Sequence, residues 1–312
     1  MAVLMLLRAS SRTGHDHTVV AIFARCVAAL AMAGMSAFAK AAGKAGASPM
    51  EILFFRSALA LPVVVIWVLL GPGLRALRPN RPSAHLSRAL LGLTSMSIMF
   101  YALSLLSLAD AITIFFIAPL IATCLSALLL GDKVGVHRWA AIGAGFLGVA
   151  IVMLPGSRHS ALSLWGMSVA ALGALLMAGV TITLRQLGQS EHEAATVFWF
   201  TVSGTVVMGC LYPFFFLHPH GLSTWLLLVG VGCAGAVIQI CTTTSLRLAP
   251  VSLTAPFDYT QLFWASLIGW LIWSDVPAIS TIIGGCLIAG AGLYTLYRER
   301  LQRQAIMSMP PQ

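Results

Sequence analysis

The residue whose type and position most favour chemistry in this chain is Asp258, which precedes a long apolar run. Residues 259–273 would make only about 22 Å of helix, short of the roughly 30 Å hydrocarbon core of a bilayer. Asp258 is therefore expected within a membrane span, where an ionised carboxylate costs about 2.5–3.5 kcal/mol and usually faces a cavity or a partner. Thr254 and Gln261 follow a helical spacing on the same face. The pattern predicts a substrate-amine contact or a proton carrier; a protonated carboxyl in a helix–helix hydrogen bond is the structural alternative.

Two arginines also interrupt apolar segments. Arg56 is followed by 14 residues of its segment, so the same length argument places it inside the span. It could pair with Asp258 or bind a substrate carboxylate in bidentate fashion, and a local contact with Glu51 is the structural alternative. Arg25 lies a turn or two inside the first segment, where we expect its long side chain to extend to the cytoplasmic interface. The small-residue face beside Arg25 could also line a passage.

A third group of polar side chains is a patch at Gln239, Thr242 and Thr243, to which Tyr101 adds a hydroxyl from another segment. These side chains could line a polar cavity or hydrogen-bond a neighbouring helix. Two histidines, His218 and His220, do not make a metal site without a third ligand, and no cofactor is expected. The candidate substrate-binding or coupling residues are therefore Asp258, Arg56, Thr254, Tyr259, Gln261, Gln239, Tyr101 and Arg25.

Composition identifies the elements that must position these residues. The chain has 312 residues, of which 59% are hydrophobic and only 9% charged. Soluble domains carry about 25% charged residues, so there are too few charges here to cover a water-facing surface. A soluble enzyme, a disordered chain and a disulfide scaffold are excluded, and the six cysteines lie in apolar runs without paired spacing. The sequence predicts an all-α integral membrane protein.

Apolar runs of about 20 residues predict ten transmembrane helices. They cover residues 19–41, 48–70, 84–107, 109–130, 136–154, 162–186, 194–217, 223–246, 249–273 and 277–297. With both termini cytoplasmic, 13 of the 18 Lys and Arg lie on the inside, Arg88 among them, against three outside and two within spans. This bias predicts an N-in, C-in topology, so the net charge of +9 is a topology signal and no nucleic-acid partner is expected. The six apolar residues at the N-terminus are too few for a cleaved signal peptide.

The two halves of the chain resemble each other. An Ala-Pro pair lies inside the fourth and ninth predicted helices, at Ala118-Pro119 and Ala255-Pro256, and each helix closes on an acidic turn, Gly131-Asp132 and Ser274-Asp275. Because each unit holds five spans, the second must cross the membrane in the opposite sense to the first. Inverted repeats of this kind are typical of alternating-access transporters. Proline removes a backbone hydrogen bond, so local opening of both helices is one expectation and packing alone is the other.

These motifs carry a family resemblance. The segment from Tyr101 to Leu106, the Leu108–Ala111 turn, Ala118-Pro119 and the 255–261 segment resemble an EamA-type member of the drug/metabolite transporter superfamily. The resemblance implies two inverted five-helix repeats at residues 19–154 and 162–297, a linker at 155–161, and cytoplasmic tails at 1–18 and 298–312. Helices one to four and six to nine would line a central cavity, with five and ten behind. The family usually has Glu where this chain has Asp132, which retains the carboxylate.

The expected function is secondary transport of a small polar organic metabolite, such as an amino-acid-like solute, across the bacterial inner membrane, with proton coupling through Asp258. A facilitative exchanger or an importer of a vitamin, nucleoside or drug-like cation is the alternative. A membrane-embedded enzyme lacks a nucleophile or metal motif, and an assembly protein without transport is the third class. Small-residue stripes in helices five and ten (Ala140, Ala144, Gly148; Gly285, Ala289) predict close packing, as a scaffold or in a homodimer.

Overall fold

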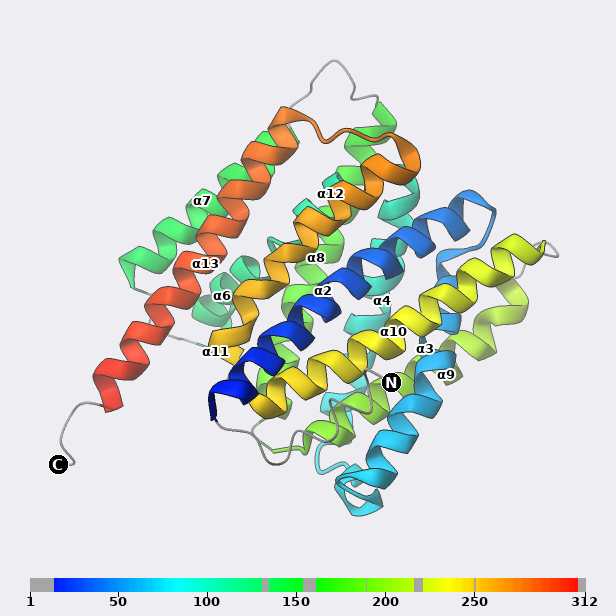
Figure 1. Ribbon diagram of the computed structural model, residues 1–312, viewed down its shortest axis with the longest axis horizontal. Helices are drawn as coiled ribbons and strands as arrows, with labels where there is room; N and C mark the ends of the chain where they lie inside the picture. Colours follow the sequence, from blue (N-terminus) through cyan, green and yellow to red (C-terminus); the bar gives the residue numbers. More distant parts are fainter. Residues whose placement is uncertain are drawn as a thin grey trace.

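The computed structural model describes residues 14–130, 135–153, 161–188, 190–215, 221–249 and 251–307. Every regular element in these ranges is a helix, which agrees with the predicted all-α class (Figure 1). Within these ranges, eight segments are long and apolar enough to cross a membrane, and α7 is a shorter apolar helix. The helices are α2 (Gly14–Lys44), α3 (Pro49–Leu70), η1 (Leu74–Leu77), α4 (Pro82–Leu105), α5 (Leu108–Phe115), α6 (Ala118–Leu130), α7 (Val136–Val152), α8 (Ala161–Leu187), α9 (Glu193–Phe215), α10 (Leu222–Leu248), α11 (Val251–Thr254), η2 (Ala255–Tyr259), α12 (Thr260–Trp273) and α13 (Ile279–Met307).

Local sequence signals explain where several helices begin. The Ser48 side chain accepts a hydrogen bond from the Glu51 backbone N–H at 3.2 Å, and the Glu51 carboxylate accepts from the Ser48 N–H at 2.7 Å. This capping box satisfies two backbone donors at the start of α3, and Pro49 occupies the first helical turn, where its missing N–H costs nothing. Ser107 caps α5 in the same way by accepting from the Asp110 N–H at 3.1 Å.

Both helices that contain an internal Ala-Pro pair are interrupted. A two-residue turn at Phe116 and Ile117 separates α5 from α6, directly before Ala118-Pro119. In the second half, α11 gives way to the 3-10 helix η2, which contains Pro256, before α12 begins. Proline lacks an N–H and its ring crowds the preceding turn, so the regular hydrogen-bond ladder is broken at both places. The predicted local opening is confirmed in both halves.

The two interruptions lie against each other. The rings of Phe116, in the α5–α6 turn, and Tyr259, at the end of η2, have centroids 5.1 Å apart. The same tyrosine hydroxyl packs so closely on α13 that a Cβ at Gly292 would collide with it. The points at which the helices deviate from regular geometry therefore meet at one place in the bundle, with Tyr259 between them and α13.

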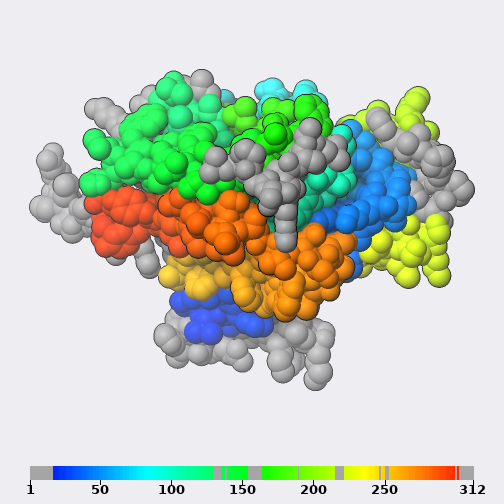
Figure 2. Space-filling model, turned by 90° about the horizontal axis from the view of Figure 1, so that it is seen from above, coloured from blue at the N-terminus to red at the C-terminus, as the bar shows by residue number. Residues whose placement is uncertain are grey.

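The helices pack in pairs that join the two halves of the chain. In Figure 1, α2 crosses the bundle between α10 and α12, and contacts confirm both neighbours. Helix α3 packs on α9, α4 on α8, and α7 on α13. Figure 2 shows α7 in green against α13 in red at one end of the molecule. Apart from α2 on α4, α3 on α4 and a few smaller contacts, the main interfaces thus link an early helix with a late one.

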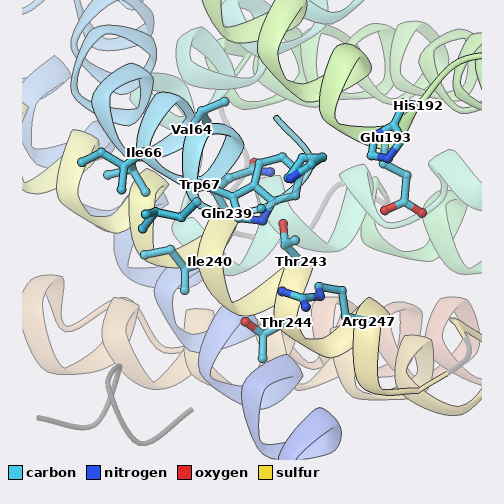
Figure 3. Close-up of a pocket in the computed structure, with 14 residues that line it drawn as sticks. Val64, Ile66, Trp67, His192, Glu193, Gln239, Ile240, Thr243, Thr244 and Arg247 are labelled. Atoms are coloured by element: carbon cyan, nitrogen blue, oxygen red, sulfur yellow. The ribbon is translucent and has the colours of Figure 1, made fainter. Parts of the chain in front are cut away.

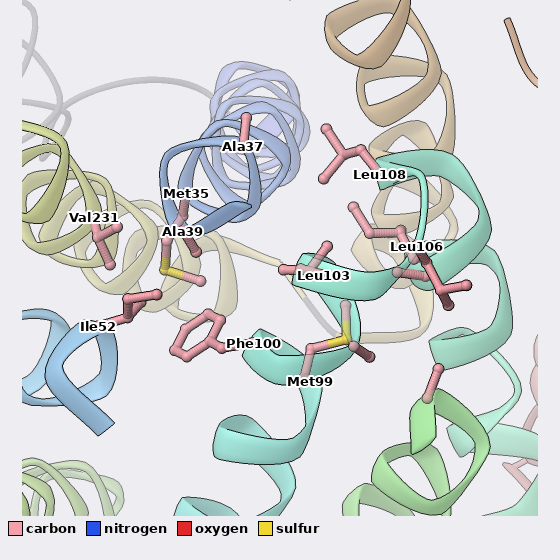
Figure 4. Packing of buried hydrophobic residues seen from close by; sticks show 14 of the residues in the cluster. Met35, Ala37, Ala39, Ile52, Met99, Phe100, Leu103, Leu106, Leu108 and Val231 are labelled. Carbon is pink, nitrogen blue, oxygen red and sulfur yellow. The ribbon is translucent and has the colours of Figure 1, made fainter. Parts of the chain in front are cut away.

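The largest hydrophobic core follows from this pairing. Met35 of α2, Ile52 of α3 and Phe100 of α4 lie close together, with Val231 of α10 on one side (Figure 4). Leu108, at the start of α5, is fully buried in the same cluster. Because residues from both halves fill one core, the central helices are held together by packing that neither half could complete alone.

Helices α7 and α13 approach each other through glycines, as the small-residue stripes predict, although the contact on α13 is at Gly284 and not at Gly285. A Cβ at Gly284 would lie 2.4 Å from the Gly148 carbonyl oxygen, and one at Gly148 would lie 2.8 Å from the Gly284 oxygen. Only glycine permits this separation of the two backbones. The homodimer through these helices stays a prediction.

Gly284→Ala is expected to destabilise the protein by about 1–3 kcal/mol, because the new methyl group forces α7 and α13 apart. Gly290→Ala on the same helix is the matched control, since nothing lies within 4 Å of its Cβ position. That control should be neutral or stabilising by up to about 1 kcal/mol, because alanine has the higher helix propensity. Thermal unfolding of the two purified variants checks this difference, and equal melting temperatures would contradict the close α7–α13 contact.

Candidate binding cavity and ion pairs

A cavity of about 510 Å³ lies between the carboxyl-terminal halves of α3 and α10 and the start of α9. Figure 3 shows Trp67, Gln239 and Thr243 turned toward a common space, with Glu193 and Arg247 beside it. The lining consists of Val63, Val64, Ile66, Trp67, Leu70, Gly71, Pro72, His192, Glu193, Gln239, Ile240, Thr243, Thr244 and Arg247. Apolar walls with a few convergent polar groups are typical of sites for small organic molecules.

Helical spacing explains why these residues share one space. Val63 and Trp67 are four residues apart on α3, and Gln239, Thr243 and Arg247 repeat every four residues on α10. Each set therefore forms a stripe along one face of its helix. The α10 stripe is polar throughout, whereas α3 supplies the indole of Trp67, so a bound molecule would meet hydrogen-bonding groups on one side and an aromatic surface on the other. Gln239 and Thr243 of the predicted polar patch thus line this cavity, whereas Thr242 does not.

Asp258 lies in η2 and binds Arg25 of α2. The Arg25 Nε donates to one carboxylate oxygen at 2.5 Å and its Nη2 to the other at 2.6 Å. This bidentate geometry gives the strongest class of ion pair between side chains. The Arg25 side chain is 14% exposed and the Asp258 side chain 36% exposed, so one end of the pair is more open than the other. The pair joins the first helix of one half to the interrupted helix of the other.

This contact corrects two expectations. Arg25 does not extend to the membrane interface, because its guanidinium is held by Asp258 in the bundle. Arg56 is not the partner of Asp258, which binds Arg25, and the Glu51 carboxylate accepts from the Ser48 N–H in the α3 capping box. Arg56 lies half-buried in the middle of α3 with its Nε buried and without a hydrogen bond.

The remaining predicted site residues are placed in different surroundings. Thr254 is fully buried at 0% exposure and Gln261 at 7%, so both are packed inside the helical bundle. Tyr259 contacts Phe116 and α13, as described above. Tyr101 is 42% exposed near the end of α4. Of the eight predicted residues, Arg25 and Asp258 form one contact, and Gln239 alone lines the described cavity.

A second ion pair closes the opposite end of α2. The Lys40 ammonium donates to Asp275 at 3.1 Å and lies 4.8 Å from the centre of the Trp273 ring. Lys40 is 2% exposed, and Lys44 lies over the same ring at 5.4 Å. Nearby, Thr281 donates to Asp110 at 2.5 Å. These contacts tie the end of α2 to the end of α12. This pair was not predicted from the sequence, because Lys40 and Asp275 are 235 residues apart and no local spacing relates them.

Arg88 also differs from its expected position. It lies in the second turn of α4, and its guanidinium carbon is 4.0 Å from the centre of the Phe200 ring of α9. The side chain thus packs inside the bundle, although the charge count assigns it to the cytoplasmic side. Among the described residues, no group of three His, Cys, Asp or Glu could hold a metal ion. His218 and His220 lie outside the described residues, as do Asp132 and Pro250.

The family and the relatives that this chain matches are all transporters. The model of the EamA-like transporter family matches residues 19–154 and 164–297. The pseudopaline exporter of Pseudomonas aeruginosa is 30% identical over 241 residues, which cover 77% of this chain and 84% of the exporter. The riboflavin transporter of Rhizobium johnstonii is 30% identical over 228 residues, covering 73% and 74% of the two chains. The S-adenosylmethionine uptake transporter of Rickettsia prowazekii is 24% identical over 247 residues, covering 79% and 81%.

A solved crystal structure supports the fold independently. It aligns with a TM-score of 0.61 and covers 93% of this chain and 99% of its own. The sequence identity is 20%, so this similarity concerns the fold alone.

Proposed function

Because the chain belongs to the EamA-like transporter family, a family of multi-pass membrane proteins, we propose that it moves a small polar organic metabolite by alternating access. Its relatives are small-molecule transporters, so the chain is a transporter and not an enzyme. Their named cargoes differ, and they include both an exporter and uptake transporters. The solute that this chain carries is therefore argued from its own cavity and ion pairs.

The proposed architecture is ten transmembrane helices in two inverted five-helix repeats. The repeats are residues 19–154 and 162–297, joined by a linker at 155–161, with tails at 1–18 and 298–312. Three features support this arrangement: the family match divides the chain in nearly the same way, equivalent helices are interrupted at Ala-Pro pairs, and the last helices of the two halves, α7 and α13, pack together. With both termini cytoplasmic in the bacterial inner membrane, the cavity at the carboxyl ends of α3 and α10 faces the cytoplasm.

The observation that carries the mechanism is the uneven closure of the two ends. At the end that contains Lys40 and Asp275, the buried Lys40 pairs with the partly exposed Asp275 and lies over the Trp273 ring, so we take this end as closed. The end that contains Gln239 and Arg247 holds the cavity. A carrier that is closed on one side and hollow on the other is in one of its two access states. To reach the other state, the closed end must open while the cavity closes.

The Arg25–Asp258 pair lies where a change of access state would alter it. It connects α2 to η2, where the helix is already interrupted and can change its direction at low cost. Separation of Asp258 from Arg25 would remove two charge-assisted hydrogen bonds to the carboxylate, which would then be free to bind a proton. Proton coupling through Asp258 would therefore accompany the change of access state. A facilitative exchanger that keeps the pair intact is the second candidate.

The size and lining of the cavity favour a small organic solute with both polar and flat unsaturated parts. Gln239 and Thr243 offer hydrogen bonds and Trp67 offers a stacking surface. An amino-acid-like metabolite, a vitamin or a nucleoside has this combination, and a drug-like cation would use the aromatic surface alone. A homodimer would use faces of α7 and α13 that are not already engaged within the chain.

A panel of metabolites tests the cavity by thermal stabilisation of the purified protein. A ligand at about 100 times its dissociation constant stabilises the native state by about 2.7 kcal/mol. The wild type should respond to one chemical class, and Thr243→Trp, which fills the cavity, should lose that response. Val237→Trp is the matched control, because Val237 lies on α10, is 40% exposed and does not line the cavity. A ligand that stabilises wild type and Thr243→Trp equally would remove the cavity from the binding site.

A further inference from the structure

Two arginine side chains enter the helical bundle without an acidic partner among the described residues. Arg56 comes from α3 and Arg88 from α4, and both helices pack on α9. There, a Cβ at Gly204 would lie 2.6 Å from the Oγ of Ser57, the residue after Arg56, and Gly204 is one turn from Phe200, on which Arg88 packs. The Nε of Arg56 and the Nε and Nη1 of Arg88 are buried and make no hydrogen bond. Buried cations in membrane proteins are costly and are almost always paired, so two unpaired ones together require an explanation.

The Arg88 side chain points into the bundle, away from the nearby helix end. Its Nη1 would lie 2.2 Å from a Cβ at Gly92, one turn further along α4, so the side chain follows its own helix toward the membrane centre. An arginine six residues from the helix start could extend to the interface instead. Because Gly92 has no side chain, the Arg88 guanidinium can pass beside it. Its central carbon lies 4.0 Å from the centre of the Phe200 ring, which favours a cation–π contact.

Arg56 approaches the same region from the cavity side. It lies seven residues before Val63 on the face of α3 that lines the cavity, about 10 Å deeper along the helix. Its Cγ would lie 3.5 Å from a Cβ at Gly235, which is one turn deeper on α10 than Gln239. The two cavity-lining stripes therefore continue inward to Arg56, and glycine on α10 permits its close passage.

Among the described residues, no salt bridge joins Arg56 or Arg88 to an acid, and most of the acids have other partners. Asp258 binds Arg25, Asp275 binds Lys40, and Glu191 accepts hydrogen bonds from the Asn80 and Arg81 backbone at 2.8 and 2.6 Å. Glu51 and Asp110 have the partners already described. Within the part of the chain that the structure describes, the charges of Arg56 and Arg88 are thus left without compensation.

We propose that Arg56 and Arg88 form a subsite for the oxyanionic group of the transported solute, a carboxylate or a phosphate. This inference rests on the proposed function and specifies its substrate class. Guanidinium groups bind such oxyanions through parallel, charge-assisted hydrogen bonds, and the buried Nε and Nη1 atoms are the donors that such a group would satisfy. The apolar and polar walls nearer the cytoplasmic end would hold the rest of the solute.

The test uses the purified full-length protein with succinate, inorganic phosphate and a neutral amide as probes. One acidic probe should raise the melting temperature of the wild type in a concentration-dependent manner, and the neutral amide should not. Arg56→Gln and Arg88→Gln should each weaken that apparent affinity at least ~10-fold, since each removes charged hydrogen bonds to the ligand. Arg88→Lys should retain only part of the affinity for the acidic probe, because lysine keeps the positive charge but lacks the paired N–H donors of the guanidinium. Arg75→Gln, at an exposed position in η1, is the control for lost positive charge and should bind normally.

A second readout separates a binding role from a structural one. Without ligand, Arg88→Gln should melt at a higher temperature than the wild type, because it relieves an uncompensated buried charge; a structural role predicts a lower melting temperature. Phosphatidylglycerol added to the micelles identifies a lipid headgroup as the source of the anion, and stabilisation by that lipid alone would overturn the solute subsite. Equal responses of the wild type and both Gln variants to the acids would also overturn it. Since binding is measured without flux, loss of transport with anion binding retained would count against the proposed function and not against the subsite.

Discussion

Replacing Asp258 by asparagine is expected to lower the free energy of unfolding by about 2 kcal/mol and to reduce transport at least ~10-fold. The substitution leaves Arg25 charged inside the bundle without its bidentate partner. Truncating one partner of a buried ion pair costs about 2–5 kcal/mol, and the lower figure applies because the Asp258 side chain is 36% exposed. Thermal unfolding in detergent and solute flux in proteoliposomes measure the two effects separately.

The double variant Arg25→Gln/Asp258→Asn provides the control. It removes both charges, so it should be more stable than Asp258→Asn alone, with a coupling free energy above about 1 kcal/mol in the double-mutant cycle. Its flux should stay low, because the interaction between α2 and η2 is still missing. Additive effects of the two single changes would show that the contact contributes neither stability nor coupling.

Replacing Asp275 by asparagine is expected to open the closed end of the protein. The change leaves the Lys40 ammonium, which is 2% exposed, without its counter-charge beside Trp273. An uncompensated buried charge favours any arrangement that hydrates it, and each 1.4 kcal/mol changes the ratio of the two access states tenfold. Amide hydrogen exchange in residues 36–44 and 268–276 should therefore accelerate by about tenfold or more.

Lys44→Met is the matched control for this prediction. Lys44 is an exposed side chain over the same Trp273 ring and forms no salt bridge with a described residue, so its loss should change hydrogen exchange little. Lys40→Met, in contrast, removes both the charge and the need to hydrate it, and should leave the end closed or more tightly closed than Asp275→Asn does. Unchanged exchange in Asp275→Asn would show that the ion pair does not hold the end of α2 to the end of α12.

Much of the fold follows from local patterns. Apolar runs of sufficient length predict the membrane-spanning helices, and the Ala-Pro pairs predict where two of them are interrupted. Capping residues such as Ser48 and Ser107 act through neighbours three residues away, so their role is readable from sequence. The polar spacing of Gln239 and Thr243 likewise predicts a polar face that the structure places on a cavity.

The partners of the charged residues could not be predicted in the same way. Asp258 selects Arg25 over Arg56 because α2 crosses η2, and that crossing joins residues 233 positions apart. Thr254 and Gln261 follow a helical spacing around Asp258, but the intervening 3-10 helix changes the rotation per residue, and both are buried. Arg88 is counted with the cytoplasmic charges from the sequence; the direction of its side chain into the bundle depends on Gly92 and on Phe200 from another helix.

Counterflow in proteoliposomes tests most directly whether this chain is an alternating-access carrier with its site at the described cavity. Liposomes loaded with the unlabelled solute that stabilises the protein should take up labelled solute transiently above its equilibrium level, because each carrier returns with a molecule bound. Val237→Trp should retain this overshoot and Thr243→Trp should lose it. The account is contradicted if labelled solute only equilibrates, or if filling the cavity at Thr243 leaves the overshoot unchanged.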